Sequence, residues 1–428
     1  MGLFKSYGRP RRAYRKDINR FYTMSKLFIN ELDLKGKRVF VRVDYNVPFD
    51  EQGNITDDAR IRATLPTINY LLDEGAKIIL ASHLGRPGGK PLPEFSLKPV
   101  AKRLNRLLNK DVTLASDCIG PEVKKQVEAM QPEDVLLLEN LRFHKGERDN
   151  DPEFAKELAS LCDVMVQDAF GNCHRAHASM VGMNEEVSQS AAGFLLKREI
   201  DYFEKAVNVP SRPVVAIVGG AKVLDKIKII ENLVKKVDKI IIGGAMAFPF
   251  LAVHGYGIGK ATVDENVAIK VLNINKLAKE RGVKIYLPVD FVAADKFDGD
   301  AETKLVTFQE VPDDWFALDI GPASTKLFSE AMQNAKTIIW NGPMGAFEID
   351  AFSRGTYSMV ESVVTAYALT IVGGGDTDLA FHRMGESYKV SFISTGGGAF
   401  LELLEGKELP GIAALTDSPS HELAGERN

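Results

Sequence analysis

The stretch PVVAIVGGAKVLDKIKII, residues 213–230, contains the pattern on which the fold prediction rests. Its apolar run at 214–218 has the length of one strand and carries no polar side chain on either face. Two glycines follow, and charged and apolar residues then succeed one another as in an amphipathic helix. A strand that is apolar on both faces is typical of a parallel sheet covered by helices on each side. The stretch therefore predicts a buried parallel strand, a glycine turn and a helix.

The same strand pattern recurs on both sides of this stretch. The other runs cover residues 37–43, 77–82, 135–140, 163–168, 239–244, 284–290, 337–342, 369–375 and 391–398. Amphipathic segments separate them, which predicts a doubly wound, Rossmann-like α/β architecture with parallel sheets. A chain of 428 residues is longer than one hydrophobic core usually serves, so we expect two such domains.

The domain boundary is predicted just before this stretch. Residues 193–212 form a densely charged helical pattern with few core positions, which ends at Pro210 and Pro213. We expect residues 24–192 together with 407–428 to form an N-terminal domain, 193–212 an interdomain helix and linker, and 213–406 a C-terminal domain.

The first 23 residues have a different composition. They carry seven Lys and Arg against one acid, Asp17, and a second methionine, Met24, opens the globular sequence. This basic extension is open to three interpretations: a disordered tail or an over-called start, a targeting segment, or an arm for an anionic surface. It is left out of the fold prediction.

Composition excludes several classes of function. The net charge of -4 provides no overall basic field of the kind that a nucleic-acid binder shows, so any anionic ligand must be held by a local cluster. We expect no nucleic-acid partner. Three cysteines cannot form an even disulfide framework, which favours a reducing compartment. No apolar run approaches the roughly 18 residues of a membrane span. We therefore expect a cytoplasmic protein without a membrane partner.

The segments that follow the predicted strands differ between the two halves. Parallel α/β sheets bind ligands beyond the carboxyl ends of their strands. In the first half these segments carry Arg42, Arg86, Arg142 and Arg175, and guanidinium forks suit a small, highly anionic ligand. In the second half they are glycine turns that open helices, which suits the phosphates of a nucleotide. One half is thus expected to bind an acid and the other a nucleotide.

Ten segments sharpen this prediction. They are RVDYNVP, ARIRATLPTI, SHLGRP, ENLRF, HRAHASM, GGAKVLDKI, LDIGP, WNGPMGAFE, GGGDT and STGGGAFLELLEG. In order and spacing, over roughly residues 24–410, they resemble those of the phosphoglycerate kinase family. The resemblance implies a monomer whose two domains flank a cleft that closes about a hinge. It also implies reversible phosphoryl transfer from 1,3-bisphosphoglycerate to ADP, giving 3-phosphoglycerate and ATP with Mg²⁺.

The resemblance also implies roles for individual residues. The 3-phosphoglycerate contacts would be Arg42, Asp44, Asn46, Arg60, His83, Arg86, Arg142 and Arg175. The nucleotide contacts would be Gly220, Lys222, Lys226, Gly244, Ala317, Asn341, Pro343, Glu348, Gly373, Gly374, Gly375, Asp376 and Thr377. Asp376 would hold Mg²⁺, and Arg60, Lys222, Gly397 and Gly398 would stabilise the transferring group.

Simpler explanations stand beside some of these roles. Asp44 and Asn46 could form only a turn before Pro48, and the glycines at 396–398 could serve only close packing. Cys173, His174 and His177 invite comparison with a zinc site, although packing and anion contact explain them better.

Other functions compete with the kinase. A dinucleotide-binding oxidoreductase would need G-x-G-x-x-G, which the chain lacks, and GYGIGKA at 255–261 has the wrong spacing for a P-loop. A binding protein that has lost turnover is a further alternative. Three positions depart from the family pattern, Pro249, Ala317 and Asp378, and they put nucleotide affinity and metal dependence in question.

Overall fold

The computed structural model describes residues 26–418. The predicted basic extension, residues 1–23, and the last residues of the predicted N-terminal domain, 419–428, lie outside this range. Within it, no helix is long and apolar enough to cross a membrane.

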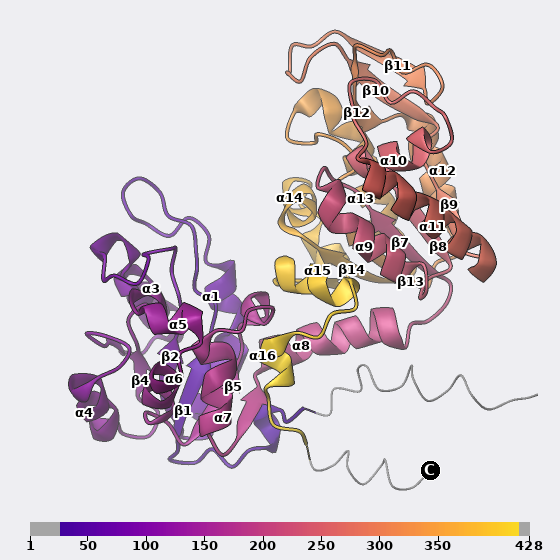
Figure 1. Cartoon of the computed structure of the whole chain (residues 1–428). Coiled ribbons are helices and arrows are strands. Elements are labelled where there is room, and N and C mark those ends of the chain that lie inside the picture. The colour runs from indigo at the N-terminus through magenta and orange to yellow at the C-terminus, as the bar shows by residue number, and fades with distance from the viewer. Residues whose placement is uncertain (1–25, 419–428) are drawn as a thin grey trace, which may run out of the picture.

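The first half of the chain forms a six-stranded parallel sheet with the order β3-β4-β2-β1-β5-β6 (Figure 1). Its strands are β1 Arg38–Arg42, β2 Lys77–Ala81, β3 Val112–Leu114, β4 Val135–Leu137, β5 Val164–Gln167 and β6 Ser190–Ala192. Its helices are α1 Ala59–Ala63, α2 Leu65–Asp73, α3 Lys98–Leu108, α4 Pro121–Ala129, α5 Lys145–Asp149, α6 Pro152–Ala159 and α7 Met183–Glu186.

Both faces of this first sheet are buried. In β1, Val39 and Val41 pack with α1, α2 and α3, whereas Phe40 points into a second cluster with α4 and α6. The continuous apolar runs of the sequence therefore reflect helices on both sides of a parallel sheet.

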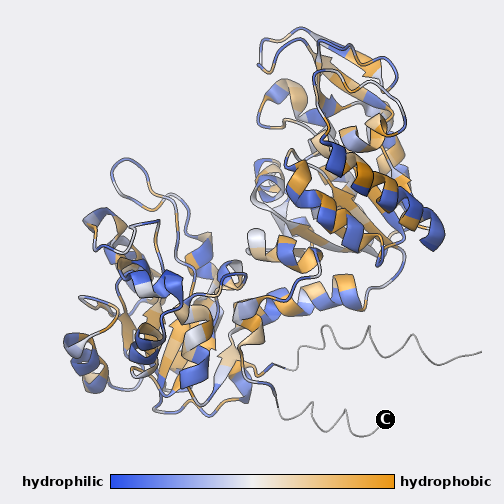
Figure 2. Ribbon diagram, in the orientation of Figure 1, coloured by the Kyte–Doolittle hydropathy of each residue, from blue (hydrophilic) through white to orange (hydrophobic). Residues whose placement is uncertain are grey.

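The second half repeats this architecture with the strand order β15-β14-β13-β7-β8-β9. The strands are β7 Val214–Val218, β8 Lys239–Ile242, β9 Lys284–Tyr286, β13 Thr337–Asn341, β14 Leu369–Gly373 and β15 Phe392–Ile393, and all pair in parallel. The helices are α9 Val223–Leu233, α10 Phe248–Ala252, α11 Glu265–Arg281, α12 Pro322–Met332, α13 Arg354–Val364, α14 Gly375–Arg383 and α15 Gly398–Leu404. The hydropathy colouring shows apolar sheets beneath helices with polar outer faces (Figure 2). The doubly wound α/β fold is confirmed, and every predicted run contains a strand.

A small antiparallel sheet was not predicted. It has the order β11-β10-β12 and consists of β10 Asp290–Ala294, β11 Thr303–Thr307 and β12 Phe316–Ile320. In Figure 1 it lies at the end of the second half farthest from the first half.

The connector is more deeply embedded than predicted. Helix α8 Phe194–Phe203 and a π-helical turn at Glu204–Asn208 join the two halves (Figure 1). We expected few core positions, but Leu196, Ile200 and Phe203 are buried in a cluster that also contains residues of both halves. We call this group of residues the shared cluster. Its existence follows from the apolar stripe that α8 carries beneath its charged face.

The chain returns to the first half after α15. Helix α16 Pro410–Ala413 follows, and the Leu27 N–H then donates to the Thr416 carbonyl at 2.8 Å. The Thr416 N–H donates to Ser190 of β6 at 3.1 Å. The two ends of the described chain thus extend the first sheet beside its edge strand β6.

Candidate active site

Basic side chains converge beyond the carboxyl ends of the first-half strands. Arg42 ends β1, His83 follows β2, and Arg142 lies in the turn after β4. The Arg42 Nη2 atom lies 3.4 Å from His83 Nδ1. Burial, together with Arg42, Arg142 and Arg175, holds the pKa of His83 well below its ordinary value. His83 is therefore neutral at physiological pH, and the positive charge comes from the arginines.

One buried acid, Glu147, lies near these arginines. Glu147 is fully buried and accepts hydrogen bonds from the Ser179 N–H at 3.0 Å and the Ser179 hydroxyl at 2.7 Å. Burial and then Arg175 and Arg42 lower the pKa of Arg142 to about 10. The buried Nε of Arg142 has no hydrogen-bond partner within the described chain. The repulsion among the arginines and the unpaired donor both favour an anion beside this group.

Asp44 and Asn46 form a turn and also hold Arg60. The Asn46 N–H donates to Asp44 Oδ1 at 3.3 Å, as in the simple turn. The Arg60 Nη1 atom donates to Asp44 Oδ2 at 3.2 Å and to the Asn46 carbonyl at 2.9 Å. The turn therefore orients Arg60, whose side chain is 44% exposed and accessible to a ligand.

Three of the predicted arginines, Arg42, Arg86 and Arg142, lie outside the cavity described next. Arg42 is only 1% exposed, and its guanidinium is bonded to the Ser179 hydroxyl and the Val43 carbonyl. It contacts His83 from behind and does not line the cavity described next. Arg86 is exposed and makes no hydrogen bond or ion pair to any residue in the described range. The structure does not bring Arg86 into the cavity.

One cavity of about 460 Å³ lies between the two halves. The first half contributes Asp44, Asn46, Asp57, Ala59, Arg60, His83, Gly171, Asn172, His174 and Arg175. The second half contributes Gly374, Gly375, Asp378, Ser394, Thr395, Gly396, Gly397 and Gly398. Residues of the predicted acid side and of the predicted nucleotide side thus line one cavity.

The glycine turns of the second half serve different purposes. A Cβ on Gly373 would lie 2.2 Å from the Phe400 ring, and one on Gly396 would lie 2.1 Å from the Phe170 ring. Close packing therefore explains these two glycines. A Cβ on Gly375 would meet nothing within 4 Å, and the nearest atom to one on Gly398 is 3.7 Å away in His174. Packing does not account for these two positions, where the backbone opens α14 and α15 into the cavity.

Two further positions require glycine because of their backbone conformation. Gly374 precedes α14 with a φ of 95°, and Gly397 precedes α15 with a φ of 37°. Both angles lie in the left-handed region, which favours glycine. The N-termini of these helices leave free N–H groups, which suits phosphate oxygens.

Two lysines and a carboxylate gather at the start of α9 and α14. Lys226 Nζ donates to the Gly219 carbonyl at 2.8 Å. Burial lowers the pKa of Lys226 to about 8, with a raising influence from Asp376 and a lowering one from Lys222. The electrostatic effects of Asp376 and Lys222 on Lys226 indicate that these three predicted residues lie close together. None of the three lines the cavity between the halves.

Other predicted nucleotide contacts hold the turns in place. The Asn341 Nδ2 atom donates to the Gly373 carbonyl at 2.7 Å, and Thr377 Oγ1 accepts from the Gly342 N–H at 2.7 Å. The Pro343 carbonyl accepts from the Gly220 N–H at 2.8 Å. A Cβ on Gly244 would lie 2.9 Å from the Gly220 nitrogen, so the two turns are in contact.

Two predicted nucleotide residues lie away from this group. Ala317 is half-buried in β12, where it packs against a small apolar cluster that includes Phe248 and Phe291. Glu348 is exposed and has no hydrogen bond or ion pair to the described part of the chain. Neither residue lines the cavity.

Comparison with known proteins identifies the family. A family model described as phosphoglycerate kinase matches residues 29–407. The chain belongs to the phosphoglycerate kinase family.

Relatives and solved structures cover nearly the whole chain. The phosphoglycerate kinase of Geobacter metallireducens is 62% identical over 396 residues, which cover 92% of this chain and 100% of that protein. The one from Aquifex aeolicus is 55% identical over 394 residues, covering 92% and 99%. The structure of phosphoglycerate kinase from Coxiella burnetii superposes with a TM-score of 0.84 at 42% identity, covering 91% of this chain and 98% of that one. The match leaves no role for the oxidoreductase and P-loop alternatives.

One departure from the phosphoglycerate kinase pattern has a visible consequence. Asp378 lines the cavity from α14, and Asp57 lines it from the first half. The pKa of Asp378 is raised, first by burial, and Asp57 raises it further. Pro249, another departure, is buried in the first turn of α10, where its missing N–H leaves no intrahelical bond unmade.

Sequence reasoning missed Glu199. It is 2% exposed on α8, and its Oε1 accepts from the Thr395 N–H at 2.7 Å and the Thr395 hydroxyl at 2.8 Å. Burial raises its pKa to about 7. Glu199 thus ties the connector to the loop just before the glycines at 396–398. The only signal in the sequence was its place one residue before Ile200, on the apolar side of a charged helix.

The zinc comparison for Cys173, His174 and His177 fails. Cys173 is fully buried, and the His177 Nδ1 atom lies 3.8 Å from Glu147 Oε1. The His174 Nε2 atom accepts from Arg175 Nε at 3.2 Å. Within residues 26–418, the grouping of metal-ligand type lies elsewhere, at Asp117, Cys118 and His144.

Proposed function

We infer that this chain catalyses the reversible transfer of a phosphoryl group from 1,3-bisphosphoglycerate to ADP, giving 3-phosphoglycerate and ATP. Membership of the phosphoglycerate kinase family supports this activity. The observation that carries it is the single cavity lined by the arginine side of one half and the glycine turns of the other. Such a cavity suits an anionic acid facing a nucleotide phosphate.

The reaction needs no general base from the protein. The acceptor carboxylate of 3-phosphoglycerate is ionised at neutral pH, and in the other direction it leaves as an anion. Catalysis therefore consists of positioning, exclusion of water and neutralisation of phosphate charge. The arginines, lysines and free backbone N–H groups of the site are suited to these tasks.

On the acid side, we assign the charged contacts to Arg60, Arg142 and Arg175. His83, being neutral, would donate or accept a hydrogen bond instead of contributing charge. Asp44 and Asn46 would meet the hydroxyl of the acid while they orient Arg60. Arg42 acts as a positioning residue behind His83.

On the nucleotide side, we assign Lys222 to the transferred phosphoryl group and Lys226 to the nucleotide phosphates. The N-termini of α14 and α15, at Gly375 and Gly398, would direct N–H groups at phosphate oxygens. These N–H groups stabilise the negative charge that develops during transfer.

Asp376 fits the Mg²⁺ that the family implies. Its side chain is exposed at the first turn of α14 and makes no hydrogen bond or ion pair to the described residues. Mg²⁺ commonly uses one or two carboxylates together with substrate phosphates. When bound with the nucleotide, the ion would neutralise phosphate charge there.

We further propose that the protein is a cytoplasmic monomer whose domains, 24–192 with 407–428 and 213–406, close about the 193–212 connector. Closure is proposed because the phosphate lysines do not reach the cavity that Arg60 lines. Small-angle scattering should show a smaller radius of gyration with both substrates bound than with either alone. An unchanged radius would rule out closure.

The activity itself is tested by ATP-dependent formation of 1,3-bisphosphoglycerate from 3-phosphoglycerate with Mg²⁺. We expect Arg60→Ala and Lys222→Ala each to lower kcat by at least about 100-fold, because each removes charge stabilisation of the transferring group. The matched controls are Arg62→Ala on α1 and Lys228→Ala on α9, both exposed, and these should keep their activity within about twofold. A folded protein that binds Mg-nucleotide without turnover would instead be a binding protein.

A further inference from the structure

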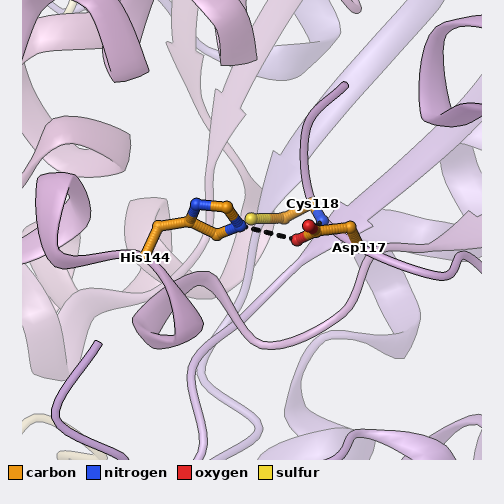
Figure 3. Close-up of side chains that lie close together, drawn as sticks. All are labelled: Asp117, Cys118 and His144. Carbon is orange, nitrogen blue, oxygen red and sulfur yellow. Dashed lines mark hydrogen bonds and ion pairs between the residues drawn. The ribbon is translucent and has the colours of Figure 1, made fainter. Parts of the chain in front are cut away.

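Three donor side chains of different chemistry meet in the first half, outside the cavity between the halves. They belong to Asp117, Cys118 and His144 (Figure 3). One carboxylate oxygen, the thiol sulfur and one imidazole nitrogen all lie within 4.8 Å of one another. The Asp117 Oδ1 atom is 2.7 Å from His144 Nε2. The reaction proposed above uses none of these groups.

The fold holds the donors together from two separate segments. Asp117 and Cys118 lie between β3 and α4, and His144 directly precedes α5. The Glu139 N–H donates to the Asp117 carbonyl at 3.3 Å, which ties the loop after β4 to the loop after β3. The arrangement is therefore set by neighbouring strand ends of one sheet.

The donor set selects a particular class of cation. Thiolate, imidazole and carboxylate together are ligands of Zn²⁺, whereas Mg²⁺ and Ca²⁺ take oxygen ligands. With bonds of about 2.0 to 2.3 Å, two atoms on one tetrahedral ion lie roughly 3.3 to 3.8 Å apart. The observed separations need only small side-chain movements to reach these values. The carboxylate and thiolate would together neutralise the dication.

Neighbouring groups orient two of the donors. The Cys118 N–H donates to Asp117 Oδ1 at 2.7 Å. The His144 ring stacks on Phe154 with a centroid separation of 5.3 Å and an interplanar angle of 26°. Such outer contacts fix the direction of metal ligands in known sites.

A path from solvent reaches two of the three donors, Asp117 and His144. The Asp117 and His144 side chains are 43% and 30% exposed, although Cys118 is buried. Both line a cavity of about 320 Å³ together with Ser116 and Glu139. This space admits an ion and leaves room for water as a fourth ligand.

We propose that Asp117, Cys118 and His144 form a binding site for Zn²⁺, with a water molecule completing the tetrahedron. Binding releases the thiol proton to solvent, since the thiolate is the ligand. The site lies two residues along the chain from Arg142, so the bound ion would hold the segment that carries this arginine.

Cobalt spectroscopy of the full-length, metal-free protein tests the proposal. Co²⁺ in a tetrahedral thiolate site gives a near-ultraviolet charge-transfer band and visible d–d bands. We expect both to saturate at one Co²⁺ per chain and to disappear when Zn²⁺ is added. Absence of the thiolate band in the intact protein would overturn the proposal.

Variants distinguish this site from adventitious binding. Cys118→Ser should lose the charge-transfer band, whereas Cys162→Ser, which changes another buried thiol of the first half, should keep it. His144→Gln changes a partly exposed ring and should weaken Co²⁺ binding at least about tenfold without unfolding the protein, as judged by circular dichroism. A band that persists in Cys118→Ser, or an unchanged affinity in His144→Gln, would show that the metal binds elsewhere.

Discussion

Lys226 is the nucleotide-side residue whose charge depends most on its surroundings. Burial lowers its pKa to about 8, so its ammonium is charged at pH 7 and largely neutral at pH 9. If it binds nucleotide phosphate, the affinity for MgADP should fall about tenfold between these pH values, because only the charged form is stabilised by phosphate. Calorimetric titration at pH 7, 8 and 9 measures this change.

Lys226→Arg provides the decisive comparison. Arginine stays charged throughout this range, so the variant should bind MgADP with nearly constant affinity. Lys228→Arg on the same helix should retain the wild-type pH dependence. An equal fall in affinity in Lys226→Arg would assign the titration to another group.

A second prediction concerns Asp168 and the pH dependence of the free energy of unfolding. It follows β5 and is buried against the first turn of α8, where its Oδ1 accepts from the Leu196 N–H at 3.1 Å, and burial raises its pKa to about 7. Between pH 4 and 7 the folded state therefore holds a proton that the unfolded state has lost, and stability from this group falls as pH rises through that window. Asp168→Asn removes this dependence while it keeps the acceptor.

The stability of Asp168→Asn relative to the wild type should therefore increase by roughly 2 to 3 kcal/mol from pH 5 to pH 8, measured by urea unfolding. Asp163 serves as the contrast, because its bond to Arg38 lowers its pKa. Its contribution is present at neutral pH and is lost as pH falls, so Asp163→Asn should destabilise the protein most at neutral pH. A constant stability difference for Asp168→Asn would contradict the burial argument.

At this scale the sequence predicted which residue types line the site but not how deeply each is buried. Arg42 ends β1 and Arg86 comes shortly after β2, yet Arg42 is covered by Ser179, far along the chain, whereas Arg86 is exposed. Glu199 was missed because its partner, Thr395, comes from the other half. Such partners are brought together by tertiary packing, and the spacing of residues within one segment does not predict them.

Elements were more predictable than residues. Every predicted run became a strand because a parallel strand buried on both faces leaves a continuous apolar signal, as in Val214–Val218. β11, Thr303–Thr307, was missed because its residues are mostly exposed and follow no apolar run. The short edge strands β3 and β6 were missed for a similar reason, since three residues carry too little pattern.

In the glycine turn that opens α14, Gly373 has a packing role and Gly375 has a proposed ligand role. Gly373→Ala would force a methyl group into the Phe400 ring, and we expect a loss of about 1 to 3 kcal/mol of stability. Gly375→Ala meets open space and should unfold at nearly the wild-type urea concentration. If Gly375 lies against phosphate, this variant should nevertheless bind MgADP more weakly. Equal unfolding midpoints for the two variants would refute the distinction.

In the whole molecule, the shared cluster should make the two halves unfold together. Both tryptophans, Trp315 and Trp340, lie in the second half, so their fluorescence reports only on that half. Met180 belongs to the first half and is fully buried in the shared cluster. Met180→Ala should cost about 2 to 5 kcal/mol and shift the tryptophan transition and the far-ultraviolet circular dichroism transition equally.

Tyr367→Ala is the control for this experiment, because this side chain is 92% exposed and outside the shared cluster. It should leave both transitions in place. If Met180→Ala moves the circular dichroism transition alone, the halves unfold independently and α8 is a passive link.

The return of the chain to the first sheet also sets an order for synthesis. Leu409, Ile412 and Leu415 are buried in the shared cluster, and Thr416 bonds to β6 beside Leu27. A nascent chain that has produced all six strands of the first sheet still lacks this cover. The half that is translated first therefore cannot complete its packing until the chain as far as Thr416 has been made.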